Sequence, residues 1–160
     1  MSEGVVKSPS AAQERLALGV VAAREQLQLT QEEFAEKASL SLKTVQRVEL
    51  KRAAPQAKTF NGLDQGAGWL PGSARLLYEE GREPVEIGRV AESASGGRPA
   101  GLLESWTDEE IERLRGATRQ QIADEAASIA KFAGEDAHFR FLHDVALIKL
   151  AAAGADSASR

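Results

Sequence analysis

The stretch that decides the fold is LTQEEFAEKASLSLKTVQRVE, residues 29–49. Thr30 can cap a helix that begins at the next residue, and Glu33 can reach back to the Thr30 amide. Ser41 is the next cap candidate, which predicts a second helix from there to about Leu50. The stretch therefore predicts two short helices joined by a tight turn.

The second of these helices has two chemically different faces. Val45 and Val48 are three residues apart and form an apolar ridge on one side, which we expect to face a core. The residues on the other side are Leu42, Lys43, Gln46 and Arg47. Lys and Arg can bond guanine, Gln can pair with adenine, and Leu can contact a thymine methyl group. This helix is therefore chemically equipped to read base edges.

Residues 29–49 resemble the helix-turn-helix of the XRE, or Cro-type, repressor family. The resemblance extends over about residues 11–81 and implies an all-α, five-helix, lambda-repressor-like domain that binds double-stranded DNA. Residues 68–74, GWLPGSA, look like the junction between the fourth and fifth helices in actinobacterial and actinophage members.

Carried over by position, the resemblance implies roles for individual residues. The positions that face or flank bases are Ser41, Leu42, Lys43, Thr44, Gln46 and Arg47. Contacts to the sugar-phosphate backbone are implied for Gln31, Lys51, Arg52 and Lys58. A buried ion pair that ties the first helix to the end of the third is implied for Arg24 and Glu49.

Two positions depart from the family pattern. Ser39 stands in the turn where the family usually has glycine, so we expect a less favourable backbone conformation or a slightly different turn there. Leu42 replaces the polar residue common at the start of the recognition helix, which bears on the bases that are read.

The sequence predicts two helical modules. The expected parts are a DNA-binding domain at 1–81, a linker at 82–104, a small helical module at 105–153 and a frayed tail at 154–160. The linker assignment rests on a concentration of Pro, Gly and Ser. In the second module, Thr107 and Glu110 form another capping pair, and Gly134 separates the last two helices.

Charge is distributed unevenly along the chain. The net charge is −4, yet residues 37–58 contain six Lys or Arg and a single acidic residue, Glu49. This local positive charge suits a DNA contact within an otherwise acidic protein. Cysteine is absent, and no stretch has the length of a signal peptide core or a membrane span, so we expect a cytoplasmic protein with no membrane partner.

No set of residues indicates catalysis or a cofactor. His138 and His143 are five residues apart, which places them on different sides of a helix and makes a shared metal improbable. No nucleophile–base pair and no glycine-rich phosphate loop stands out. We therefore expect no enzyme activity, no metal and no cofactor.

The second module leaves two interpretations open. Its last helix carries a large apolar set that would suit a homodimer: Phe139, Phe141, Leu142, Val145 and Ile148. Polar and basic residues crowd the start of the preceding helix and would suit a second DNA contact on a monomer: Arg115, Thr118, Arg119 and Gln120. We favour the second DNA contact, a layout like that of some mycobacteriophage immunity repressors.

The resulting hypothesis is a sequence-specific transcriptional repressor, of the kind that confers phage immunity. The rival hypothesis is an antitoxin-like interaction protein whose C-terminal helices cover a partner protein, with DNA binding for autoregulation.

Overall fold

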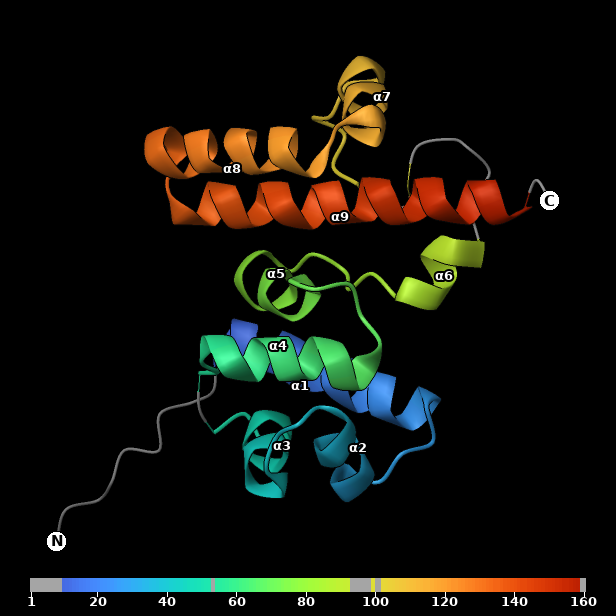
Figure 1. The fold of residues 1–160 in the computed structure, drawn as a ribbon. Helices are drawn as coiled ribbons and strands as arrows, with labels where there is room; N and C mark the ends of the chain where they lie inside the picture. Colours follow the sequence, from blue (N-terminus) through green and yellow to red (C-terminus); the bar gives the residue numbers. More distant parts are fainter. Residues whose placement is uncertain (1–9, 53, 93–98, 100–101, 159–160) are drawn as a thin grey trace, which may run out of the picture. The chain divides into compact units, whose positions relative to one another are not determined.

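Nine helices make up most of the residues that the computed structural model describes, namely 10–52, 54–92, 99 and 102–158 (Figure 1). Over these residues there is no β-strand, only an isolated antiparallel bridge between Trp69 and Glu86. The expected all-α fold, with an N-terminal helix-turn-helix followed by further helices, is confirmed. Residues 1–9 and 53 of the expected DNA-binding domain, residues 93–98, 100 and 101 of the expected linker, and residues 159 and 160 of the expected tail lie outside the described residues.

The chain divides into two compact units. The first contains the residues up to Ala67 together with Ala74–Pro84, and the second contains Gly68–Ser73 and the residues from Val85 on. The first unit thus ends at Pro84, close to the boundary expected at residue 81, and one short segment inside the N-terminal region is assigned to the second unit. The backbone passes from one unit to the other three times.

The first unit is built on helices α1 to α5. Their bounds are Ala11–Gln26 for α1, Gln31–Lys37 for α2, Leu42–Glu49 for α3, Ala57–Ala67 for α4 and Ser73–Glu80 for α5. Capping boxes start the first two helices, with Ser10 and Gln13 at α1 and Thr30 and Glu33 at α2. The side chain of Ser41 caps α3. Local sequence signals therefore set where the first three helices begin.

Close helix packing holds α2 and α3 in place. Phe34 of α2 and Val45 of α3 are fully buried, and Val48 is nearly so. At Gly62 in α4, a Cβ atom would lie 2.8 Å from the carbonyl oxygen of Ala38 in the turn after α2, so a larger residue would push α4 away. The glycine lets α4 support the turn that joins α2 to α3.

Within the part of the chain that the structure describes, three residues other than glycine take positive φ angles, all at helix ends: Gln28 (56°), Ser39 (54°) and Lys51 (58°). At the end of α2, the Ser39 amide donates to Glu36 O at 3.1 Å, and the Leu40 amide donates to Ala35 O at 2.9 Å. This is the Schellman pattern, in which glycine is the favoured residue at the position of Ser39. The less favourable backbone expected at Ser39 is present.

The second unit contains four helices. They are α6 (Ile87–Glu92), α7 (Asp108–Gly116), α8 (Arg119–Ala133) and α9 (Glu135–Ala158). Residues 82–104, expected as a linker, include α6 and supply Val85, Val90 and Leu102 to the core of this unit. Helix α9 also extends through most of the segment expected as a frayed tail, to Ala158.

The segment Gly68–Ser73 is bound into the second unit by hydrogen bonds. The Leu70 amide donates to Val85 O at 2.7 Å, and the Val85 amide donates to Ser73 Oγ at 3.2 Å. His143 Nδ1 lies 2.8 Å from Pro71 O. Trp69 and Leu70 are both buried. A loop that lies between α4 and α5 in the sequence is thus an integral part of the C-terminal unit.

Polar contacts fix α7 against its neighbours. Arg113 makes two hydrogen bonds to the Glu125 carboxylate of α8, at 2.8 and 2.9 Å. Lys149 of α9 donates to the carbonyl oxygens of Arg115 and Ala117, both at 2.7 Å, and so caps the end of α7. The turn between α7 and α8 is therefore held from two sides.

Candidate nucleic-acid interface

Helix α3 presents its polar face to solvent. The packing of Val45 and Val48 into the core leaves Lys43 and Arg47, one turn apart, exposed on the opposite side. This orientation is the one that a groove-reading helix requires.

The other residues expected to read or flank bases are either less exposed than these two cations or already hydrogen-bonded within the chain. Leu42, Thr44 and Gln46 are half-buried. The Ser41 hydroxyl accepts the Thr44 amide at 3.1 Å and lies 2.8 Å from the Thr44 hydroxyl. Both hydroxyl groups therefore already serve the N-terminus of α3.

The residues expected to contact the DNA backbone lie on three segments around α3. Arg52 follows α3 and Lys58 lies in the first turn of α4, and both are exposed. Lys51 is half-buried in the left-handed turn that ends α3. Gln31 is the first residue of α2 and is half-buried.

Three side chains form a network behind this surface. Arg24 Nε lies 2.8 Å from Glu49 Oε1, with side-chain exposures of 18% and 7%. Arg24 Nη1 also donates to Leu29 O at 3.0 Å, just before the cap of α2. Gln31 Nε2 donates to the other Glu49 oxygen at 2.5 Å. The only carboxylate in the basic stretch 37–58 is therefore turned inward and bonded by two donors.

The link between Gln31 and Glu49 was not expected from the sequence, which assigned Gln31 to a phosphate contact alone. The two residues are 18 positions apart and lie on different helices, so no local spacing pairs them. The family resemblance gave only the Arg24 partner of Glu49.

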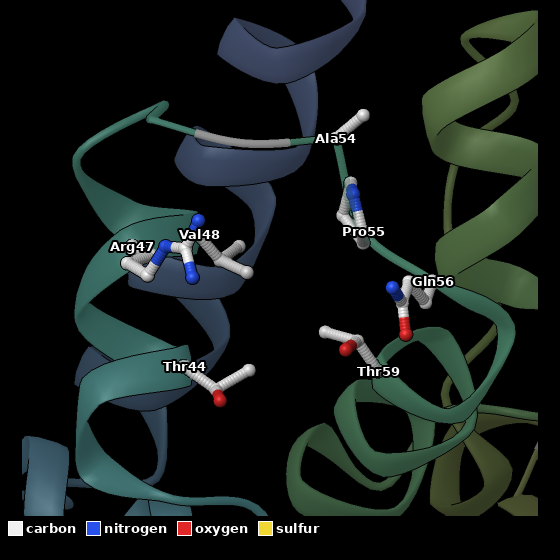
Figure 2. Close-up of a pocket in the computed structure, with 7 residues that line it drawn as sticks. All are labelled: Thr44, Arg47, Val48, Ala54, Pro55, Gln56 and Thr59. Carbon is white, nitrogen blue, oxygen red and sulfur yellow. The ribbon is translucent and has the colours of Figure 1, made fainter.

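A cavity of about 240 Å³ opens beside α3 (Figure 2). One wall comes from α3 and the other from the chain that leads into α4. The lining residues are Thr44, Arg47, Val48, Ala54, Pro55, Gln56 and Thr59. Sequence reasoning missed this cavity because it depends on how the segment 54–59 folds back toward α3.

The candidate second contact lies where α7 passes into α8. Thr118 caps α8 in a capping box with Gln121, and Gln120 donates to Asp124 at 2.8 Å. The Arg115 guanidinium pairs with Glu112, and its side chain is only 18% exposed. Arg119 is exposed in the first turn of α8. Of the two arginines among the four residues expected here, Arg119 is therefore the more exposed.

The apolar residues of the last helix are mostly covered within the chain. Phe141, Val145 and Ile148 are buried and belong to the core cluster of the second unit. Leu142 remains 40% exposed. The surface on which the homodimer interpretation depended is thus largely occupied by the chain's own core.

Several acidic side chains have lowered pKa values with clear local causes. The pKa of Glu33 is lowered by hydrogen bonds from Thr30, and that of Glu110 by hydrogen bonds from Thr107. The pKa of Glu125 is lowered chiefly by the hydrogen bonds from Arg113. In each case the hydrogen bonds stabilise the ionised carboxylate more than the protonated acid.

Comparison with family models identifies residues 20–63 as a helix-turn-helix. The matched segment runs from the middle of α1 into α4 and includes all of α2 and α3. The match confirms the resemblance to the XRE family over this segment, which is a helix-turn-helix of the kind found in DNA-binding transcription regulators. Neither the curated proteins nor the solved structures gave a match.

Two further observations concern other kinds of site. Over the described residues, no helix is both long enough and apolar enough to cross a bilayer. Within the same part of the chain, no three His, Cys, Asp or Glu residues gather as a metal site would require.

Proposed function

We propose that the chain is a transcriptional repressor that reads the major groove with α3. The observation that carries this proposal is the exposed Lys43 and Arg47 pair on a helix whose opposite face is buried through Val45 and Val48. Repression follows when the bound protein covers a promoter or a neighbouring site. A role in phage immunity rests on the resemblance to repressors of that class.

The second part of the proposal is that the α7–α8 turn makes a further DNA contact. Arg119 is exposed at the start of α8, where backbone amides of a 15-residue helix also favour phosphate. The monomeric form is favoured because the apolar side of α9 is already covered by the unit's own core.

Selection from random duplex DNA followed by footprinting tests the proposal. Lys43→Ala should weaken binding to the selected site by about 1–3 kcal/mol and relax the base preference at one position. Lys131→Ala, which removes an exposed cation from α8, should leave that preference unchanged. An identical preference in wild type and Lys43→Ala would contradict the assignment of the reading face.

Two measurements test the finer parts. A reporter with the selected site across its promoter should be transcribed less when the protein is present, and increased transcription would contradict a repressor. Light scattering should give the mass of a monomer bound to an asymmetric site. A doubled mass on a palindromic site would support the homodimer, and co-purification with a second protein from native cells would support an antitoxin.

A further inference from the structure

The cavity beside α3 gathers polar groups from two segments that are separate in the sequence. Thr44 and Arg47 come from α3, while Gln56 and Thr59 come from the segment that begins α4. The side chains of Thr44 and Thr59 face each other across the opening, and the Gln56 amide lies near Thr59 (Figure 2). The cavity therefore offers the Thr59 hydroxyl and the Gln56 amide beside the Arg47 guanidinium group, whereas the Thr44 hydroxyl is already bonded to that of Ser41.

The start of α4 adds partial positive charge at the same place. The amides of Thr59 and Phe60 both donate to Gln56 O, at 2.9 and 3.1 Å, so these two amides are already satisfied and the first helical turn begins at the cavity wall. The first amides of an α-helix have no acceptor within the helix and carry partial positive charge. Lys58 is exposed in this turn. Both the backbone and the nearby side chains favour an anion here.

The charge and size of the cavity define the anion further. Among its lining residues, Arg47 is the one charged group, and no carboxylate is present. Its volume of about 240 Å³ would hold roughly eight waters at about 30 Å³ each, which leaves room for a phosphodiester and part of a sugar. Arginine, hydroxyl, amide and helix amide groups are the ones that proteins use to bind DNA phosphates.

We propose that this cavity receives a phosphodiester group of the bound DNA, and that Arg47 contacts that phosphate and not a base edge. The inference rests on the proposed function, because it needs α3 to lie against DNA. It divides the two exposed cations of α3 between two tasks. Lys43 reads bases, whereas Arg47, which shares the cavity with Thr44 and Val48, fixes the register of one strand.

Neutral phosphates placed one at a time in the selected duplex test this assignment. Each phosphate is replaced by a methylphosphonate, and binding is measured for wild type and Arg47→Ala. At one position the wild type should lose about 10-fold or more in affinity, as expected when a charged hydrogen-bonded contact is removed. Arg47→Ala should lose nothing further at that position. Its salt slope should be smaller than that of wild type by about 1.

Two variants in α4 separate the cavity from its surroundings. Thr59→Val keeps the shape of the side chain and removes the hydroxyl, so its binding should weaken and should depend less on the same phosphate. Asn61→Ala alters an exposed residue of the same helix outside the cavity and should bind as wild type does. Thermal unfolding followed by circular dichroism shows that each variant is folded.

The possible outcomes bear differently on the two proposals. A wild type that selects no duplex DNA would overturn the proposed function and this inference with it. Selective binding in which Arg47→Ala changes the preferred base at one position, and remains sensitive to every neutral phosphate, would overturn this inference alone. Arg47 would then be a base-reading residue like Lys43.

Discussion

Gln31 Nε2 lies 2.5 Å from Glu49 Oε2, so the first residue of α2 is tied to the last residue of α3. Glu49 is bonded at its other oxygen by Arg24 of α1, which also holds the carbonyl of Leu29. One carboxylate therefore fixes three helices relative to one another. The orientation of α3 relative to α1 and α2 depends on this arrangement.

Arg24→Ala should destabilise the protein by about 2 kcal/mol, because it leaves a mostly buried carboxylate without its cation. Urea unfolding followed by circular dichroism measures the loss. Arg89→Ala is the matched control, since Arg89 is 75% exposed in its ion pair with Glu86, and its effect should be below about 1 kcal/mol. Equal losses in the two variants would show that the network around Glu49 contributes no more than a surface pair.

Ser39→Gly should stabilise the protein by about 0.5–1 kcal/mol. Ser39 has a φ of 54°, which glycine adopts without the steric penalty of a Cβ atom. The gain is smaller than the full penalty because glycine also loses more backbone entropy on folding. Ser39→Ala keeps the Cβ atom and should give no gain in the same urea titration. A stabilising alanine would point to a cause other than the backbone.

Glu125→Gln should reduce stability at neutral pH and have little effect in acid. Arg113 lowers the pKa of Glu125 in the folded state. The pair therefore stabilises the fold at pH values above the ordinary pKa of a carboxyl group. That contribution is lost as the pH falls through the lowered pKa, where the carboxylate is protonated. Urea midpoints of both proteins, measured from neutral pH into the acid range, should converge. Arg113→Ala should remove the same pH-dependent difference, and a difference that persists without Arg113 would contradict its role.

Arg119→Ala should shorten the footprint on one side of the selected site and lower the salt slope by about 1, if α8 contacts a phosphate. The base preference at the α3 half of the site should be unchanged. Lys131→Ala, at the other end of α8, should leave both the footprint and the slope as they are. An unaltered footprint for Arg119→Ala would remove the second DNA contact from the proposal.

The beginnings of α1, α2 and α3 could be predicted from the sequence because their signals are local. Thr30 and Glu33 lie within one turn of each other, and Ser41 caps the helix that it precedes. The unusual backbone at Ser39 was also foreseen, because a single position departs from the family pattern.

Long-range partners could not be foreseen in the same way. The bond from Gln31 to Glu49 joins two helices, and the bond from His143 to Pro71 spans 72 positions. The short helix α6 was missed because Pro, Gly and Ser around it are typical of linkers, and its burial through Val90 depends on the second unit. The cavity beside α3 could not be predicted because it depends on the path of residues 54–59, which no periodicity in the sequence determines.

The route of the backbone has a consequence for cutting the chain in two. A break between Pro84 and Val85 would leave Gly68–Ser73 on the N-terminal piece. The hydrogen-bond partners of Leu70 and Pro71, which are Val85 and His143, would then lie on the C-terminal piece. Neither piece alone could complete the C-terminal fold, so the two fragments should recognise each other and reassemble without a peptide link, as split reporter proteins do.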